Sequence, residues 1–119
     1  MSRAAVSILV FGIYLVFLGA LLVILPNPLL GLVSLPPVTD VYLRLAGMLI
    51  LILAFYFIMA ARSGFTPFFR WTIVARLAAG LFLTGFILAG LARPVILLFW
   101  LGDLAGLLWT WWALRADAK

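Results

Sequence analysis

Three ionisable residues, Arg44, Arg76 and Asp103, lie inside long apolar stretches of this sequence. A charged side chain is costly in hydrocarbon, so each is a candidate for function if these stretches cross a membrane. Asp103 lies near the middle of its stretch, too deep for a short carboxylate to reach water. Arg76 lies in the preceding stretch, within about one helical turn of Asp103 in depth if neighbouring helices run antiparallel. We therefore predict that Arg76 and Asp103 form an ion pair inside the protein.

Arg44 has two interpretations. It stands four residues after Asp40, a spacing that allows an ion pair on one helix face, and its side chain can extend toward the membrane surface. Alternatively, Arg44 turns inward toward Asp103, so that two guanidinium groups face one carboxylate. Such a positive, water-poor pocket suits a molecule with an anionic or polar head group and an apolar tail: a lipid, a quinone or a fatty acid. For the pair of Arg76 and Asp103, three roles stay open: structural, ligand or ion binding, and proton relay.

The residue types that are missing limit the chemistry. The chain of 119 residues has no cysteine and no histidine, and its three acidic residues are all aspartate. A thiol nucleophile, a disulfide, a histidine-based zinc site and a histidine or cysteine haem ligand are therefore excluded. General acid–base catalysis would depend on the three aspartates and three tyrosines. We predict no catalytic residues, no metal site and no cofactor, and an enzyme is the weakest of the function classes.

The composition indicates that the protein folds in lipid. Hydrophobic residues make up 69% of the chain and charged residues 9%, against about 45–50% and about 25% in soluble domains. Four stretches are long enough to cross a bilayer as helices: residues 4–25, 41–61, 67–90 and 94–114. We predict a single all-α domain over residues 1–119, an integral membrane antiparallel four-helix bundle. A cleaved signal peptide is the alternative for the first stretch, but that run is long and its small-residue motif poor.

Local signals mark the ends of these helices. Pro26-Asn27-Pro28 ends the first stretch, and Thr39-Asp40 provides good N-cap residues for the second. Thr66 followed by Pro67 resembles a cap with proline at the first helical position of the third. Residues 26–40 are too short and too rich in proline to span, so we predict a re-entrant or interfacial loop that covers the bundle.

Small residues in each stretch indicate close helix packing, because membrane helices associate through short interhelical distances. Gly102 and Gly106 stand at G-x-x-x-G spacing in the fourth stretch. The other stretches carry their own small residues: Gly12, Gly19 and Ala20; Ala46 and Gly47; Gly80, Thr84, Gly85 and Ala89. Helical spacing places Arg76, Gly80 and Thr84 on one face of the third stretch. It places Asp103, Gly106 and Thr110 on one face of the fourth. We predict that these two faces meet.

The distribution of positive charge predicts the orientation. Arg3, Arg62, Arg70, Arg115 and Lys119 fall on one side of the predicted membrane, and Arg93 alone falls on the other. The positive-inside rule therefore places both termini in the cytoplasm. Trp71, Trp109, Trp111 and Trp112 lie at the same side, as in an interfacial aromatic belt. The net charge of +5 is explained by this asymmetry, and we predict no binding to nucleic acid.

These residues also resemble a known group of proteins. The glycine-rich first stretch with its proline-containing loop, Arg44-Leu45-Ala46-Gly47, Pro67 to Thr72, Arg76, Asp103 and Trp109-Thr110 resemble DoxX-like families of small bacterial four-span membrane proteins. The resemblance implies a four-helix bundle in the bacterial inner membrane, sometimes an accessory or redox-associated subunit. No redox centre is evident in this chain. Small multidrug exporters are also four-span proteins, but their membrane-embedded glutamate has no counterpart here.

We therefore predict a non-catalytic membrane protein. It would act as an accessory or assembly subunit and hold a lipid- or quinone-like amphiphile near Arg44, Arg76 and Asp103. The alternative is a small oligomeric transporter in which Asp103 is the coupling carboxylate, since four spans of this length enclose little volume. Expected partners are membrane lipid and, for either role, other membrane subunits or further copies of the chain.

Overall fold

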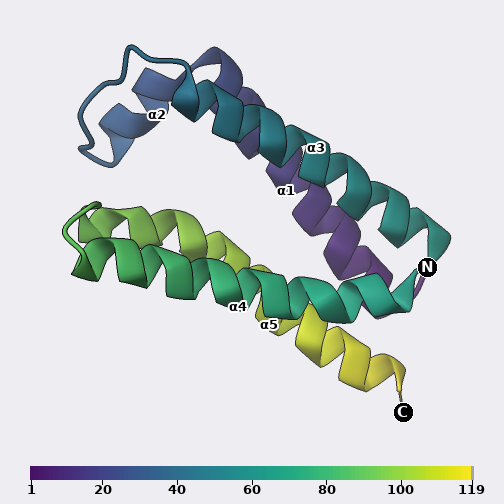
Figure 1. Cartoon of the computed structure of the whole chain (residues 1–119). Coiled ribbons are helices and arrows are strands. Elements are labelled where there is room, and N and C mark those ends of the chain that lie inside the picture. The colour runs from purple at the N-terminus through teal and green to yellow at the C-terminus, as the bar shows by residue number, and fades with distance from the viewer. Residues whose placement is uncertain (119) are drawn as a thin grey trace. The chain divides into compact units, whose positions relative to one another are not determined.

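The computed structural model describes residues 1–118 and contains helices and connecting loops but no strand in that part of the chain. In chain order the elements are α1 (Arg3–Ile24), α2 (Pro26–Leu32), α3 (Tyr42–Ser63), α4 (Thr66–Leu88), the short 3₁₀ helix η1 (Pro94–Ile96) and α5 (Leu97–Asp117) (Figure 1). The predicted all-α class is confirmed. Lys119, counted above among the positive charges, lies outside the described residues.

Four helical segments are long and apolar enough to cross a membrane: α1, α3, α4 and the segment Pro94–Asp117. They contain 22, 22, 23 and 24 residues, and a helix of that length spans about 33–36 Å, slightly more than the hydrocarbon core. Large apolar side chains are exposed along all four, including Phe17, Phe55 and Leu81. Such surfaces suit lipid rather than water. The chain is therefore a multi-pass membrane protein, and the predicted number of spans is confirmed.

Turn-forming residues explain where the helices end. Pro26 opens α2 directly after α1, and the Asp40 carboxylate accepts a hydrogen bond from the Tyr42 N–H at 3.0 Å, the predicted cap of α3. Gly64, at φ +68°, forms the turn between α3 and α4. The prediction that Thr66 caps α4 is wrong: α4 begins at Thr66 and its cap position is Phe65. The Thr66 hydroxyl instead donates to the Gly64 carbonyl at 3.4 Å, which turns it away from the helix N–H groups.

Residues 26–40 fold into the seven-residue helix α2 and an extended return. The Asn27 side-chain amide donates to the Val38 carbonyl at 3.0 Å and accepts from the Val38 N–H at 2.8 Å. This two-way contact ties the two ends of the segment together. Seven residues are too few to span, as predicted, and the interfacial or re-entrant placement stays a prediction.

The described chain divides into two compact units, which we describe separately. The α1–α3 unit comprises Leu9–Met59. In it α1 and α3 run antiparallel, because Gly12 lies against Ile58 whereas Gly19 lies against Gly47. A Cβ added to Gly19 would lie 2.9 Å from the Gly47 carbonyl oxygen, and a Cβ on Gly47 would lie 2.9 Å from that of Gly19. The two backbones therefore touch at this crossing, as small residues allow in membrane helices.

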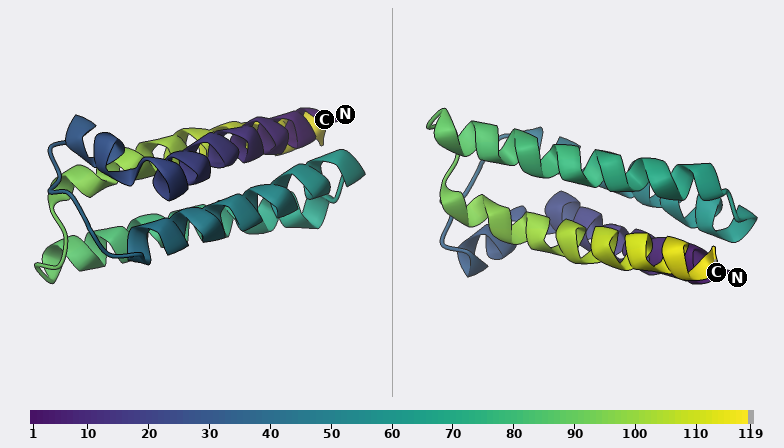
Figure 2. Two further views of the ribbon diagram at one scale, coloured as in Figure 1. Left: turned by 90° about the horizontal axis from the view of Figure 1, so that it is seen from above. Right: turned by 90° about the horizontal axis from the view of Figure 1, so that it is seen from below.

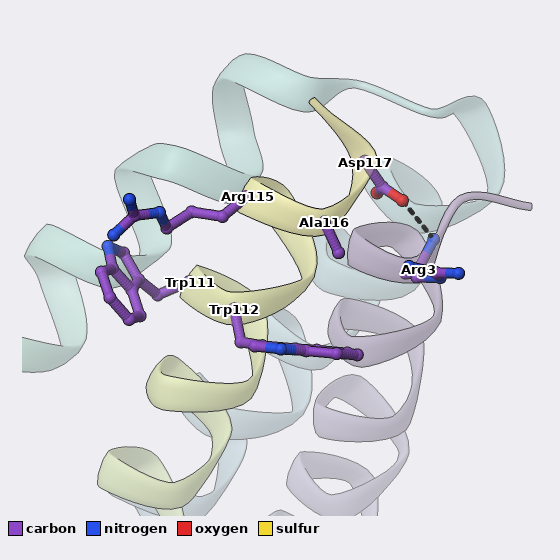
Figure 3. A pocket seen from close by; sticks show the side chains of 6 residues that line it. All are labelled: Arg3, Trp111, Trp112, Arg115, Ala116 and Asp117. Atoms are coloured by element: carbon purple, nitrogen blue, oxygen red, sulfur yellow. Dashed lines mark hydrogen bonds between the residues drawn. The ribbon is translucent and has the colours of Figure 1, made fainter. Parts of the chain in front are cut away.

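The α4–α5 unit comprises Met1–Ile8 and the chain from Ala60 onward. Here α4 and α5 run antiparallel (Figures 1 and 2), joined by a turn in which Gly90 adopts φ +77°. The first turns of α1 lie against the end of α5. The Asp117 carboxylate accepts a hydrogen bond from the backbone N–H of Arg3 at 3.3 Å (Figure 3). It also accepts one from the backbone N–H of Ala4 at 3.0 Å. The end of α5 thereby caps the start of α1, whose first N–H groups have no partner within the helix.

Candidate functional site: a buried polar network at Arg76

Arg76 on α4 is only 4% exposed, although it is an arginine in a membrane-spanning helix. Its Nε donates to the Thr72 carbonyl at 3.2 Å, and its Nη2 donates to the Thr72 hydroxyl at 2.9 Å. The same Nη2 donates to the hydroxyl of Thr110 on α5 at 3.2 Å. The i−4 spacing of Thr72 places its hydroxyl beside the guanidinium, and Thr110 supplies the contact to the second helix.

The network continues from α5 to α1. The Thr110 and Ser7 hydroxyl oxygens lie 2.9 Å apart, and both residues are fully buried. Ser7 donates its single hydroxyl proton to the Ala4 carbonyl at 2.7 Å. Thr110 must therefore donate to Ser7 while it accepts from Arg76. The donors run in one direction, from Arg76 through Thr110 and Ser7 to a backbone carbonyl, and this order lets each hydrogen bond polarise the next.

Trp100 forms a second contact between α4 and α5. Its indole Nε1 donates to the Arg76 carbonyl at 2.8 Å. Its ring lies over Gly80, where an added Cβ would come within 2.5 Å of the indole. Gly80 therefore makes room for Trp100. Thr84, predicted on the same face, is exposed and donates to the Gly80 carbonyl within its own helix at 2.8 Å.

Asp103 lies on α5, two helical turns before Thr110, and is half-buried. It belongs to the same unit as Arg76. The two predicted residues are thus brought into one region. Their direct ion pair stays a prediction, whereas the hydrogen bonds of Arg76 to Thr72 and Thr110 were not predicted.

Arg44 lies in the α1–α3 unit and is exposed. Its guanidinium Nη1 donates to the carbonyl of Val23 in the last turn of α1. The last carbonyls of a helix have no partner within the helix, so an arginine from a neighbouring helix can satisfy one. Asp40 is engaged separately, at the start of α3. A role for Arg44 beside Arg76 and Asp103 stays a prediction.

Sequence reasoning missed Thr72 and Trp100 as partners of Arg76, and Ser7 as the partner of Thr110. Thr72 could have been found, because it stands one helical turn before a buried charge. Ser7 and Trp100 depend on which helices are neighbours, and a single sequence carries no signal for that.

The arrangement offers hydrogen-bond donors and acceptors rather than reactive groups. Within residues 1–118, no group of three or more histidine, cysteine, aspartate or glutamate residues could hold a metal ion. The hydroxyls of Ser7 and Thr72 end on the carbonyls of Ala4 and Phe69, which neither take up nor release protons. Chemically, the network can fix the positions of three helices and of one positive charge.

The chain has no match among protein-family models, curated proteins or solved structures. The DoxX-like resemblance therefore stays a prediction.

Proposed function

We propose that this multi-pass membrane protein is non-catalytic and acts as an accessory or assembly subunit. The observation that supports this most is the use of Arg76: its guanidinium donates to Thr72 and Thr110, and Thr110 in turn binds Ser7. A charged group placed in this way holds α1, α4 and α5 together. A small set of helices with large apolar side chains exposed along its spans suits a subunit that supports a larger membrane assembly.

The proposal includes a lipid- or quinone-like molecule beside Arg76 and Asp103. A charge near the middle of a span is a polar point in hydrocarbon, where a head group can form hydrogen bonds. Arg76 is buried by the protein itself, whereas Asp103 is half-buried. We therefore expect Asp103 to face the molecule and to accept a hydrogen bond from a hydroxyl of a quinol or lipid head group.

Gentle extraction from the native membrane, followed by native mass spectrometry, tests this proposal. We expect a stoichiometric protein subunit, an amphiphile or both to leave the membrane with the chain. Asp103→Ala should lose the amphiphile while far-UV circular dichroism shows a folded protein, and Thr84→Val, at an exposed hydroxyl on α4, should keep it. A bare monomer from the native membrane would contradict the accessory role, and an amphiphile that survives Asp103→Ala would contradict its location.

Transport is the second candidate. Asp103 is an acidic residue in the middle of a span, and its side chain is half-buried, so an ion or proton could reach it. A coupling carboxylate predicts pH-dependent flux in proteoliposomes that disappears in Asp103→Asn. A non-catalytic subunit predicts no such flux in either protein.

We further propose that both termini lie in the cytoplasm of a bacterial cell. The chain contains no cysteine, so a single introduced thiol reports its own side of the membrane. Ser2→Cys should resist a membrane-impermeant maleimide in intact cells, and Ala92→Cys should react. The opposite labelling pattern would show that both termini lie outside the cytoplasm.

A further inference from the structure

We propose that the α4–α5 unit binds the phosphate of an anionic phospholipid head group at the end where the chain starts. The site is a pocket lined by Ser2, Thr66, Arg70, Trp111, Arg115 and Asp117, together with apolar residues. It is separate from Arg76 and Asp103, and it does not depend on the accessory role proposed above.

The pocket brings together two positive charges from different helices. Arg70 comes from the first turns of α4, and Arg115 comes from the last turn of α5. The hydroxyl residues Ser2 and Thr66 line the same pocket, which has a volume of about 520 Å³. Guanidinium groups bind phosphate oxygens through paired hydrogen bonds, and the Ser2 hydroxyl, which accepts from the Ala5 N–H, still has a proton to donate. A phosphate is the anion that this combination suits best.

A second, adjoining pocket extends the positive surface. It has a volume of about 860 Å³ and is lined by Arg3, Trp111, Trp112, Arg115, Ala116 and Asp117 (Figure 3). The Cζ atom of Arg115 lies 4.9 Å from the centre of the Trp111 ring, so a cation–π contact positions this guanidinium. Trp111 and Arg115 line both pockets. Together the pockets present Arg3, Arg70 and Arg115.

Asp117 also lines both pockets and adds one negative charge beside the three arginines. Its Oδ1 accepts the Arg3 N–H and its Oδ2 accepts the Ala4 N–H at the start of α1. The positive end of the α1 dipole lies at the same place. Both carboxylate oxygens are therefore engaged at the start of α1, and the two pockets together stay net positive, with three arginines against one aspartate.

The neighbouring residues place the pocket at the depth of lipid head groups. Trp71, Trp111 and Trp112 are 60%, 49% and 57% exposed at this end of the unit, and exposed tryptophans concentrate at the membrane interface. Ile73 and Leu114 form apolar lining of the pocket. A soluble anion gains nothing from such a lining, whereas a phospholipid places the beginning of its acyl chains there. Basic pockets between membrane helices bind lipid head groups in this manner.

The test uses the purified full chain in detergent and native mass spectrometry with added phosphatidylglycerol or phosphatidylcholine. We expect the chain to retain phosphatidylglycerol and to bind it at least tenfold more tightly than the zwitterionic phosphatidylcholine. The double variant Arg70→Ala with Arg115→Ala should lose about tenfold or more in affinity for phosphatidylglycerol, because each basic residue near an anionic head group contributes several-fold.

Arg62→Ala is the matched control. Arg62 is an exposed arginine in the last turn of α3, within the same unit, and lines neither pocket. Its removal should leave phosphatidylglycerol binding within about twofold of the unchanged chain. If Arg62→Ala lowered the affinity for phosphatidylglycerol as much as the double variant, the binding would be general charge attraction and the proposed site would be wrong.

A second double variant and a competition measurement complete the test. Should the double alanine variant fail to fold by circular dichroism, Arg70→Lys with Arg115→Lys keeps the charges and should show an intermediate loss, since lysine cannot form the paired contacts. An undiminished affinity in that folded variant would overturn the proposal. Millimolar inorganic phosphate should fail to displace phosphatidylglycerol, and complete displacement would assign the pocket to a soluble phosphate instead.

Discussion

Thr110→Val removes one hydroxyl and nearly preserves the shape of the side chain, so it isolates the hydrogen bonds that join three helices. In the unchanged protein the Thr110 oxygen accepts from Arg76 Nη2 at 3.2 Å and lies 2.9 Å from the Ser7 oxygen. Thr110 is fully buried, so water does not replace the lost partner. We expect the variant to fold and to be less stable.

The size of the loss follows from those two contacts. Hydrogen bonds between membrane helices average about 0.6 kcal/mol and reach about 1.7 kcal/mol, and a bond to a charged donor contributes about 1.5–3 kcal/mol. Arg76 keeps the Thr72 hydroxyl and Ser7 keeps the Ala4 carbonyl, so the lower end applies to each. We expect the free energy of unfolding to fall by about 2 kcal/mol, which is roughly a thirtyfold change in the unfolding equilibrium constant.

Sodium dodecyl sulfate titration in mixed micelles, followed by far-UV circular dichroism, measures this difference. Thr84→Val is the matched control on α4, because the exposed Thr84 hydroxyl binds only the Gly80 carbonyl of its own helix. Its free energy of unfolding should change by less than about 0.5 kcal/mol. Thr110→Ser keeps the hydroxyl and should recover most of the stability that Thr110→Val loses.

A double-mutant cycle with Ser7→Ala then separates the two contacts. Because Ser7 and Thr110 bind each other, the two losses should not add, and a coupling energy of about 0.5 kcal/mol or more is expected. A Thr110→Val effect equal to that of Thr84→Val, or fully additive losses, would show that the network does not join the helices.

Two other substitutions test the α1–α3 unit. Gly47→Ala places a Cβ 2.9 Å from the Gly19 carbonyl oxygen and should lower the free energy of unfolding by about 1–3 kcal/mol. Gly85→Ala is the control on α4, where an added Cβ meets nothing within 4 Å, and it should be neutral or stabilising in the same titration. Equal losses of stability in the two variants would contradict the close crossing of α1 and α3. Asn27→Ala removes both contacts to Val38, so amide exchange in residues 33–40 should speed up at least tenfold, whereas unchanged exchange would mean that other contacts hold this segment.

The fold could be predicted because a membrane simplifies the problem. Four long, mainly apolar runs expose too much apolar surface for a water-soluble fold. Pro26 and Pro94 mark helix boundaries, because proline cannot continue a preceding helix. The error at Thr66 has a local cause. Its hydroxyl could bond forward into the helix or back to Gly64, and the sequence does not distinguish a cap from a first helical residue.

The candidate site could be predicted only in part, because its charged residues stand out in the sequence and their partners do not. A buried charge is conspicuous in an apolar sequence, so Arg76 and Asp103 were identified from their types and depth alone. The groups that hold Arg76 are not conspicuous, because threonine and serine are common in membrane helices. Ser7 lies 103 positions from Thr110 in sequence, and only the packing of α1 on α5 makes them neighbours.

The distribution of acidic residues assigns Asp103 a distinct role in this arrangement. Asp40 caps α3, and Asp117 caps α1, so both are committed at helix ends. Thr72 and Thr110 fix the position of the Arg76 guanidinium, but as neutral groups they do not balance its charge. A buried cation is costly without an opposite charge, and Asp103 is the acidic residue that lies within a span of the same unit as Arg76. If Asp103 pairs with Arg76 as predicted, a molecule that binds Asp103 would compete with Arg76 for this carboxylate, and its binding would change the contacts that Arg76 makes with Thr72 and Thr110.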